Sequence, residues 1–385
     1  MITEIDYSKY RCGNLINRTF AYADIQLAIE KSNLKFETLG ESFEGRSIKL
    51  TTLGTGNIKI MLWSQMHGDE PTATAALFDV LNFFNLSNHE LKESILSSCT
   101  LYIIPVINPD GMEKFTRRNA QGIDINRDFL GQQSPEGRIL KDFRDKIKPD
   151  FAFNLHDQGS LYSIPKTKET VAISLLAPAF DDTLAINWNR EQAMKVIICI
   201  NETLQKLASR QIGRFNDEFE PRAFGDNFQK SGSATILIES GILKNDFEKQ
   251  EIRKLNFYGL LSALSAISNQ TYQEKDLINY LMIPVQKKEL FHVLLRNCEI
   301  SDSTKPYRID IGINYTEIFD EKTRKLEKHF QIADLGSLTN FNAFEIIDAT
   351  ELILTGKPTF ERAVDLILKD KNEQTIVEWK AGIRI

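Results

Sequence analysis

The sequence is poor in the residues that mark several protein classes. It has only four cysteines in 385 residues, scattered and without a CxxC pair, which excludes a disulfide framework and a zinc knuckle. No window approaches the ~18 uncharged apolar residues of a membrane helix. The first twenty residues include acids and lack the apolar core of a signal peptide. We therefore expect a protein with free thiols, no membrane partner and a cytoplasmic location.

The chain also lacks an excess of positive charge. Its net charge is −6 and its pI is near 5.6, and it has no long Lys/Arg run, so we expect no nucleic-acid partner. Hydrophobic residues make up 42% and charged residues 26%, proportions that are ordinary for a globular chain with a sizeable core. The composition leaves the oligomeric state open.

Strand-like and helix-like segments alternate between about residues 20 and 270. This pattern predicts an α/β fold, with a mixed, mostly parallel sheet flanked by helices. The expected strands are 47–54, 58–65, 100–107, 151–155 and 234–239, and the expected helices are 23–33, 69–84, 135–147, 189–210 and 245–268, the last capped by Asn245 or Asp246.

The pattern changes after about residue 275. Short alternating or β-branched runs, separated by Gly, Pro and charged turns, replace the helices. We therefore expect two domains, residues 1–275 and a small β-rich domain of residues 276–385. The second domain carries no motif that indicates its role.

Polar side chains follow the expected strands where each strand ends. His67 and Glu70 follow 58–65, His156 follows 151–155, and Glu239 ends 234–239. Ligands of such sheets bind outside the carboxyl ends of the strands. Two histidines and one glutamate, with a position left for water, are the ligands of a catalytic zinc, which acidifies water and polarises a carbonyl. Glu239 is then free to act as the general base and acid.

Three arginines lie close together between these strand ends. Arg117, Arg118 and Arg127 fall within eleven residues, beside Asn119 and Asn126. A fixed guanidinium binds a carboxylate through two hydrogen bonds and can stabilise an oxyanion. Next to a hydrolytic zinc, such a group indicates an exopeptidase or an enzyme that acts on acylated amino acids. The other three histidines lie in polar stretches and are expected at the surface: His89, His292 and His329.

The order of these motifs resembles the zinc carboxypeptidase family typified by carboxypeptidase A. The motifs read HGDE, NPDG, TRRNAQGIDINRDF, NLHDQG and ILIESG, and they span about residues 40 to 270. The resemblance implies one zinc ion per chain and the following roles. His67, Glu70 and His156 bind zinc, Glu239 is the general base, Arg117 (with Arg118 as the second candidate by register) stabilises the oxyanion, Asn126 and Arg127 hold the substrate carboxylate, and Asp124 orients the first histidine.

The chain departs from this family before the catalytic glutamate. The usual tyrosine is missing from GRFNDEFEPRAFGDNFQKSG, and we expect Arg222 and Asp226 to face the specificity pocket instead, with Gly225 near its floor. Only 86 residues separate Glu70 from His156, which implies a more open site. A polar terminal residue, such as the diaminopimelate of cell-wall peptides, is one hypothesis.

Three functions remain open from the sequence. The leading one is a zinc metallocarboxypeptidase acting on a peptide with a free carboxylate. The second is an amidohydrolase of small N-acyl amino acids, similar to the aspartoacylase and succinylglutamate desuccinylase branch, which shares the same residue set. The third is a binding module with a degenerate metal site.

Overall fold

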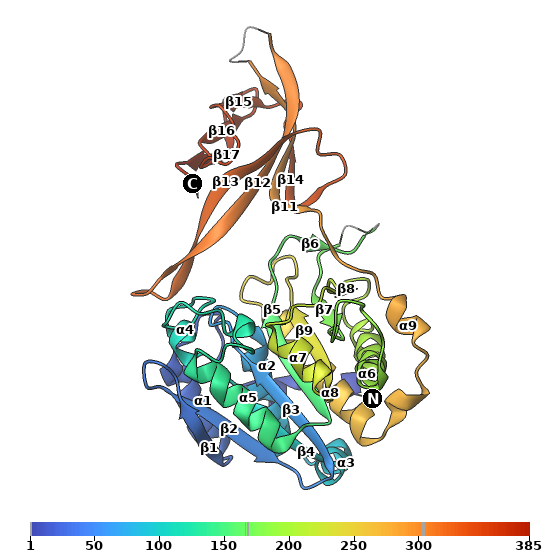
Figure 1. Ribbon diagram of the computed structural model, residues 1–385. Coiled ribbons are helices and arrows are strands. Elements are labelled where there is room, and N and C mark those ends of the chain that lie inside the picture. The colour runs from blue at the N-terminus through green and yellow to red at the C-terminus, as the bar shows by residue number, and fades with distance from the viewer. Residues whose placement is uncertain (1, 166, 168, 302–304) are drawn as a thin grey trace. The chain divides into compact units, whose positions relative to one another are not determined.

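The chain forms two compact units (Figure 1). The computed structural model describes residues 2–165, 167, 169–301 and 305–385. The larger unit is Met1–Ser160 with Glu169–Gln286, and the smaller one is Leu161–Lys168 with Lys287–Ile385. Residues 276–286 therefore lie with the larger unit, and Tyr280 is buried in its core.

The larger unit is built on an eight-stranded sheet in the order β1-β2-β4-β3-β5-β9-β7-β8. Its four central strands, β4, β3, β5 and β9, run parallel, while β1, β2 and β7 add antiparallel pairings. The bounds are β1 Phe36–Glu41, β2 Ser47–Leu53, β3 Ile58–Ser64, β4 Cys99–Ile104, β5 Phe151–Asp157, β7 Ile173–Leu176, β8 Ile212–Arg214 and β9 Ala234–Ser240.

Helices cover both faces of this sheet. One face packs on α1, α2, α3, α6 and α8, and the other packs on α5 and α7. The bounds are α1 Tyr22–Ser32, α2 Thr72–Leu86, α3 Glu90–Ser98, α4 Pro109–Glu113, α5 Pro135–Ile147, α6 Trp188–Leu204, α7 Phe224–Lys230, α8 Gln250–Ser268 and α9 Ile278–Leu281, with the 3₁₀ turns η1 Ile2–Glu4, η2 Tyr7–Lys9, η3 Ile125–Arg127 and η4 Thr271–Glu274.

Strand β3 shows why the central strands are continuous apolar runs. Ile60 and Leu62 point to the face covered by α2 and α8, whereas Met61 and Trp63 point to the face covered by α5 and α7. Because both faces are covered, successive residues on either side of the strand must be apolar. The predicted α/β fold with a mostly parallel sheet is confirmed.

A buried ion pair joins α2 to α8 and to the N-terminal segment. Arg253 Nε lies 2.7 Å from Asp79 Oδ2. The same carboxylate accepts from the Tyr7 hydroxyl at 2.9 Å and from the Cys12 backbone N–H at 2.7 Å. This network holds α2 and α8 together, and α2 begins two residues after Glu70.

Helix α8 begins later than the sequence predicts. Its first residue is Gln250, preceded by Lys249 in a left-handed conformation with φ of 51°. Asp246 is four residues before Gln250, yet its carboxylate accepts from the N–H groups of Gln250, Glu251 and Ile252. Asp246 therefore satisfies the free N–H groups of the helix, although the chain between is not helical.

The smaller unit is β-rich, as the sequence predicts. Two four-stranded sheets, β13-β12-β11-β14 and β15-β16-β17-β18, share a core, and β10 pairs with β6. The bounds are β6 Tyr162–Ser163, β10 Lys287–Lys288, β11 Leu290–Ile300, β12 Tyr307–Asp320, β13 Lys325–Gly336, β14 Asn342–Asp348, β15 Ile353–Thr355, β16 Leu366–Lys369, β17 Thr375–Lys380 and β18 Ile383–Arg384.

One histidine of this unit corrects a prediction from the sequence. His292 was expected at the surface, but it lies in β11 and is 5% exposed. Its ring stacks on Tyr315 with centroids 3.6 Å apart, and its Nδ1 accepts from the Tyr315 backbone N–H at 3.1 Å. The expectation is wrong because the apolar residues that follow, from Val293 to Leu295, belong to a strand that enters the core.

Two further expectations concern sulfur and membranes. All four cysteines are buried and unpaired. Among the described residues, no helix is both long and apolar enough to cross a membrane.

Candidate active site

The predicted polar residues meet at the carboxyl edge of the parallel strands. His67 and Glu70 lie in the loop between β3 and α2, His156 is near the end of β5, and Glu239 is near the end of β9. Strands β5 and β9 pair in register, with His156 directly opposite Glu239. The parallel pairing therefore places a candidate ligand and the candidate base side by side.

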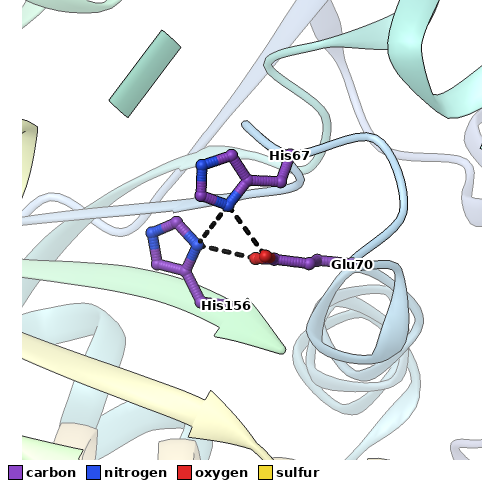
Figure 2. A group of neighbouring side chains, drawn as sticks. All are labelled: His67, Glu70 and His156. Carbon is purple, nitrogen blue, oxygen red and sulfur yellow. Dashed lines mark hydrogen bonds and ion pairs between the residues drawn. The ribbon is translucent and has the colours of Figure 1, made fainter. Parts of the chain in front are cut away.

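Figure 2 shows His67, Glu70 and His156 facing one point. His67 Nδ1 lies 2.8 Å from Glu70 Oε1, and His156 Nδ1 lies 2.7 Å from Glu70 Oε2. The two Nδ1 atoms are 3.1 Å apart. All three residues are buried, and their candidate ligand atoms lie within 4.8 Å of one another. Two imidazole nitrogens and one carboxylate around one point form a three-ligand set for a divalent metal.

The loop that carries His67 and Glu70 is held by the NPDG turn. A Cβ added at Gly68 would lie 2.0 Å from the backbone carbon of Gly111. Asn108 also donates from its side chain to the Met66 carbonyl at 3.3 Å. Since backbone meets backbone here, glycine is required at Gly68, and the turn fixes the path of the ligand loop.

Asp124 sets the orientation of the His67 ring. Its Oδ1 lies 3.1 Å from His67 Nε2 and accepts from the Asn126 backbone N–H at 3.0 Å. A carboxylate only accepts hydrogen bonds, so His67 Nε2 carries a proton. In the neutral ring, Nδ1 then offers its lone pair toward Glu70 and His156. A carboxylate behind a metal-binding histidine typically fixes its tautomer and basicity in this way.

The electrostatics of the three residues fit a cation. Burial alone lowers the pKa of His67, but the Glu70 charge and the Asp124 hydrogen bond raise it to about 9. Burial works against ionisation of Glu70, yet the two histidines lower its pKa, while burial lowers the pKa of His156. A divalent ion among these atoms can replace the His67 proton. Zinc is the ion that this donor set and an acid–base role favour.

The environment of Glu239 suits a residue that accepts and releases a proton. Burial, and then the nearby Glu70 charge, raise its pKa well above the usual value. Among the described residues, no group forms a hydrogen bond with its buried Oε2. A carboxyl group with one unsatisfied oxygen and a raised pKa is suited to take up and release a proton.

Of the two candidate arginines after the NPDG turn, only Arg117 reaches the cluster. Its Nη1 lies 3.3 Å from Glu70 Oε1 and 3.2 Å from His67 Nδ1, and its Nε donates to Asp124 Oδ2 at 3.0 Å. Arg118 is exposed and donates instead to the Gly122 carbonyl at 3.0 Å. The geometry therefore favours Arg117 as the cation that faces a reacting carbonyl.

Arg127, which was predicted to bind the substrate carboxylate, binds the side-chain carboxylate of Glu220. Arg127 Nε lies 3.0 Å from Glu220 Oε2, and Arg127 Nη1 donates to the Asn126 backbone carbonyl at 2.8 Å. Arg222 also clasps Glu220, from Nε at 2.9 Å and from Nη2 at 2.8 Å. The Arg222 hydrogen bonds are the largest cause of the lowered pKa of Glu220. Glu220 is a residue that the sequence did not single out.

Two other predicted residues, Asn126 and Asp226, form hydrogen bonds with the segment around Glu220. Asn126 accepts through Oδ1 from the Phe224 backbone N–H at 2.9 Å, which links η3 to the start of α7. Asp226 accepts from the Glu220 backbone N–H at 2.9 Å, and burial raises its pKa to about 6. Arg222 thus binds the carboxylate of Glu220, and Asp226 binds the backbone N–H of Glu220.

Further residues behind the cluster were given no role from the sequence. Asp157, the last residue of β5, donates its backbone N–H to Glu70 Oε2 at 3.1 Å. Its carboxylate pairs with Lys249 at 2.9 Å and accepts from the Thr72 hydroxyl at 2.5 Å. The only signal in the sequence was that Asp157 follows His156.

Comparisons with known proteins show what part of this chain is similar to. Residues 23–192 match the family model described as zinc carboxypeptidase. Carboxypeptidase SOL1 of Arabidopsis thaliana is 38% identical over 112 residues, which are 26% of this chain and 23% of that protein. Probable carboxypeptidase 2 of Arthroderma benhamiae is 25% identical over 238 residues, 58% of this chain and 42% of that protein.

A solved structure has the same fold. The metallo-carboxypeptidase from Burkholderia cenocepacia aligns with a TM-score of 0.53 and 16% identity, over 66% of this chain and 70% of that one. The chain spans less than half the length of the two curated relatives. These matches confirm the predicted resemblance, and the group His67, Glu70 and His156, which could hold a metal ion, agrees with the predicted zinc cofactor. The role of each site residue stays a prediction.

Proposed function

We propose that this chain, which matches the zinc carboxypeptidase family model over residues 23–192, is a zinc-dependent metallocarboxypeptidase. One observation carries the proposal. The Nδ1 atoms of His67 and His156 and the carboxylate of Glu70 face one point, with Glu239 beside His156 on the next strand. His67, Glu70 and His156 would hold one zinc ion, which supplies a Lewis acid that acidifies water and polarises a carbonyl.

The chain's own residues supply the proton transfer and the charge stabilisation. Glu239 accepts a proton from the attacking water and returns it to the leaving amide nitrogen, as its raised pKa allows. Arg117 donates to the carbonyl oxygen as negative charge develops there. Asn126 and Arg127 hold the carboxylate of the residue released, and Asp124 keeps His67 in the tautomer that binds metal.

Substitution of Glu239 tests this mechanism. In Glu239→Gln, kcat is expected to fall by about 10²–10⁴-fold because the proton acceptor is lost, while zinc content stays at one ion per chain. The exposed Glu218→Gln, in the same unit, is the control and should match the wild type. Unreduced activity in Glu239→Gln would remove this residue from the mechanism.

A substrate panel separates the peptidase from its alternatives. The zinc-loaded protein is given peptides ending in Leu, Lys, Glu or diaminopimelate, their C-terminal amides, and N-acyl amino acids, with products identified by mass. The proposal requires release of the last residue from free peptides but not from the amides. Cleavage of N-acyl amino acids alone would indicate the amidohydrolase, and zinc binding without cleavage would indicate a binding module.

Among the residues that the structure describes, no contact favours the cell-wall hypothesis over other peptides. Arg222 and Asp226, on which it was based, both bind Glu220. Diaminopimelate-ending peptides therefore remain one arm of the panel, and clear preference for a terminal Leu would reject them.

The contact between Arg127 and Glu220 makes a separate prediction about binding. A substrate carboxylate that binds Arg127 must displace the Glu220 carboxylate, which lies 3.0 Å from Arg127 Nε. Glu220→Gln is expected to lower KM by roughly three- to fivefold, since a partly exposed ion pair contributes under about 1 kcal/mol. kcat should not change, and Glu218→Gln is again the control. A raised KM would mean that Glu220 supports the site rather than competes for it.

A further inference from the structure

One ammonium group lies where three segments of the candidate active site meet. Lys249 Nζ is 2.9 Å from Asp157 Oδ2 and 3.4 Å from the Ser240 carbonyl. Asp157 follows the ligand His156, and Ser240 follows the base Glu239. The same Asp157 oxygen accepts from the hydroxyl of Thr72, two residues after the ligand Glu70. A single cation thus connects the ends of β5 and β9 and the start of α2.

The link reaches a metal ligand through hydrogen bonds. Asp157 also donates its backbone N–H to Glu70 Oε2 at 3.1 Å. The orientation of Glu70 therefore depends on the position of Asp157, and Asp157 is held from behind by Lys249 and Thr72. Residues behind metal ligands commonly fix ligand orientation in this way.

The position of Lys249 has conformational and electrostatic costs. Its backbone is left-handed with φ of 51°, a conformation that is strained for a residue other than glycine. Its side chain is 8% exposed and that of Asp157 is 6% exposed. A buried ion pair contributes little net stability, because desolvation offsets the attraction. Stability alone therefore does not account for a strained residue that carries a buried charge here.

We propose that Lys249 is a positioning residue that fixes Glu70, His156 and Glu239 through Asp157, Thr72 and Ser240. Its kinetic consequences rest on the proposed function, whereas its effect on zinc affinity does not. Loss of this link is expected to weaken zinc binding and to lower kcat, with little change in KM, because Lys249 contacts the catalytic segments rather than the residues that hold the substrate carboxylate.

The sign of the change in zinc affinity shows whether Lys249 acts by orienting the ligands or by its positive charge. Removing a nearby cation should by itself tighten the binding of Zn²⁺. Loss of ligand orientation should weaken it, by about 10–100-fold for a residue of this kind. The predicted weakening therefore opposes the purely electrostatic effect.

The test uses the full chain and four variants. Zinc affinity is measured by competition with a chelator. The values of kcat and KM are measured on the peptide that the wild type cleaves most efficiently. Lys249→Met should lose about 10-fold or more in both zinc affinity and kcat. Lys249→Arg, which keeps the cation, should recover most of both. Lys275→Met, which breaks the partly exposed pair with Glu202, is the matched control and should not change either.

The double variant Lys249→Met/Asp157→Asn covers the case in which Lys249→Met does not fold. It leaves no unpaired buried charge, so folding stability should return while zinc affinity and kcat stay low. Wild-type zinc affinity in the double variant, or tighter zinc binding in Lys249→Met, would overturn the proposal. A wild type that binds zinc but cleaves nothing would reject the peptidase, and the zinc measurements would still decide the role of Lys249.

Discussion

The two units each bury a histidine, and the two rings have opposite acid–base properties. In the larger unit, the pKa of His67 is raised to about 9. In the smaller unit, the pKa of His292 is lowered to about 4. Both are almost fully buried, at 2% and 5% exposed, so the difference does not come from the degree of burial.

The neighbours of each ring account for the difference. Burial lowers the pKa of both histidines, but His67 faces the carboxylates of Glu70 and Asp124. His292 stacks on Tyr315 and Phe344, and burial and the charge of Lys328 both lower its pKa. Carboxylates around an imidazole create a site for a cation, whereas aromatic rings leave the same side chain as a neutral part of the core.

The largest expected effect comes from removing the carboxylate that the two ligand histidines share. Glu70→Gln keeps the shape of the side chain but not its charge. Zinc affinity should fall by more than ~100-fold, since even residues behind a ligand account for about 10–100-fold. In the zinc-free protein, the pKa of His67 should drop from about 9 toward that of His292. Proton NMR titration and chelator competition measure these changes.

The control for this variant is an exposed glutamate of the same unit. Glu251 pairs with Lys254 on the surface at 3.3 Å, and Glu251→Gln should leave zinc affinity and the His67 pKa unchanged. If the His67 pKa stays near 9 in Glu70→Gln, the difference between the two units has another cause.

A smaller effect is expected from Asp124→Asn. Asp124 contacts His67 Nε2 rather than the metal side of the ring, so zinc affinity should fall by about 10–100-fold. The His67 pKa should fall less than it does in Glu70→Gln. Asp145→Asn, which breaks the ion pairs with Arg144 and Lys141 on α5, is the control, and equal effects of the two variants would contradict the assigned role of Asp124.

The pH dependence of the smaller unit tests the other side of the comparison. The unfolded chain binds a proton at His292 near pH 6.5, whereas the folded chain does so only near pH 4, so stability falls as the pH is lowered through this window. Between pH 7.5 and pH 5 the expected loss is about 2 kcal/mol. Hydrogen exchange of β11 and β12, corrected for intrinsic rates, measures it.

Replacing either histidine of this unit shows which one is responsible. His292→Asn should reduce the pH dependence, while His329→Gln, at a side chain 39% exposed, should retain it. A pH dependence that is unchanged in His292→Asn would assign the effect to other groups.

Strand periodicity was sufficient to predict β2, β3, β4, β5 and β9 of the larger sheet, and the meeting of its polar residues, but not the strands β1, β7 and β8. Parallel strands end at a common edge, so the positions of His67, His156 and Glu239 after apolar runs indicated that they would converge. The pairing of His156 with Glu239 follows from register, which a single sequence does not specify.

The residues that support the site were not predictable in the same way. Lys249 and Glu220 pair with Asp157 and Arg127, which are distant in the sequence, and neither directly follows a strand. His292 was misread because the polar residues before it, Lys287 to Glu289, conceal that it belongs to a buried strand. The contacts and burial of such residues depend on three-dimensional packing rather than on the local sequence pattern.

The close approach of Gly68 and Gly111 has a consequence for protein engineering. At this point backbone packs directly on backbone, since a Cβ at Gly68 would lie 2.0 Å from the Gly111 backbone. If only the HGDE loop were transplanted onto another sheet, its backbone would lose the packing against the NPDG turn that determines its path. The HGDE loop is therefore portable only together with the NPDG turn, and any library that diversifies one of them should keep the other fixed.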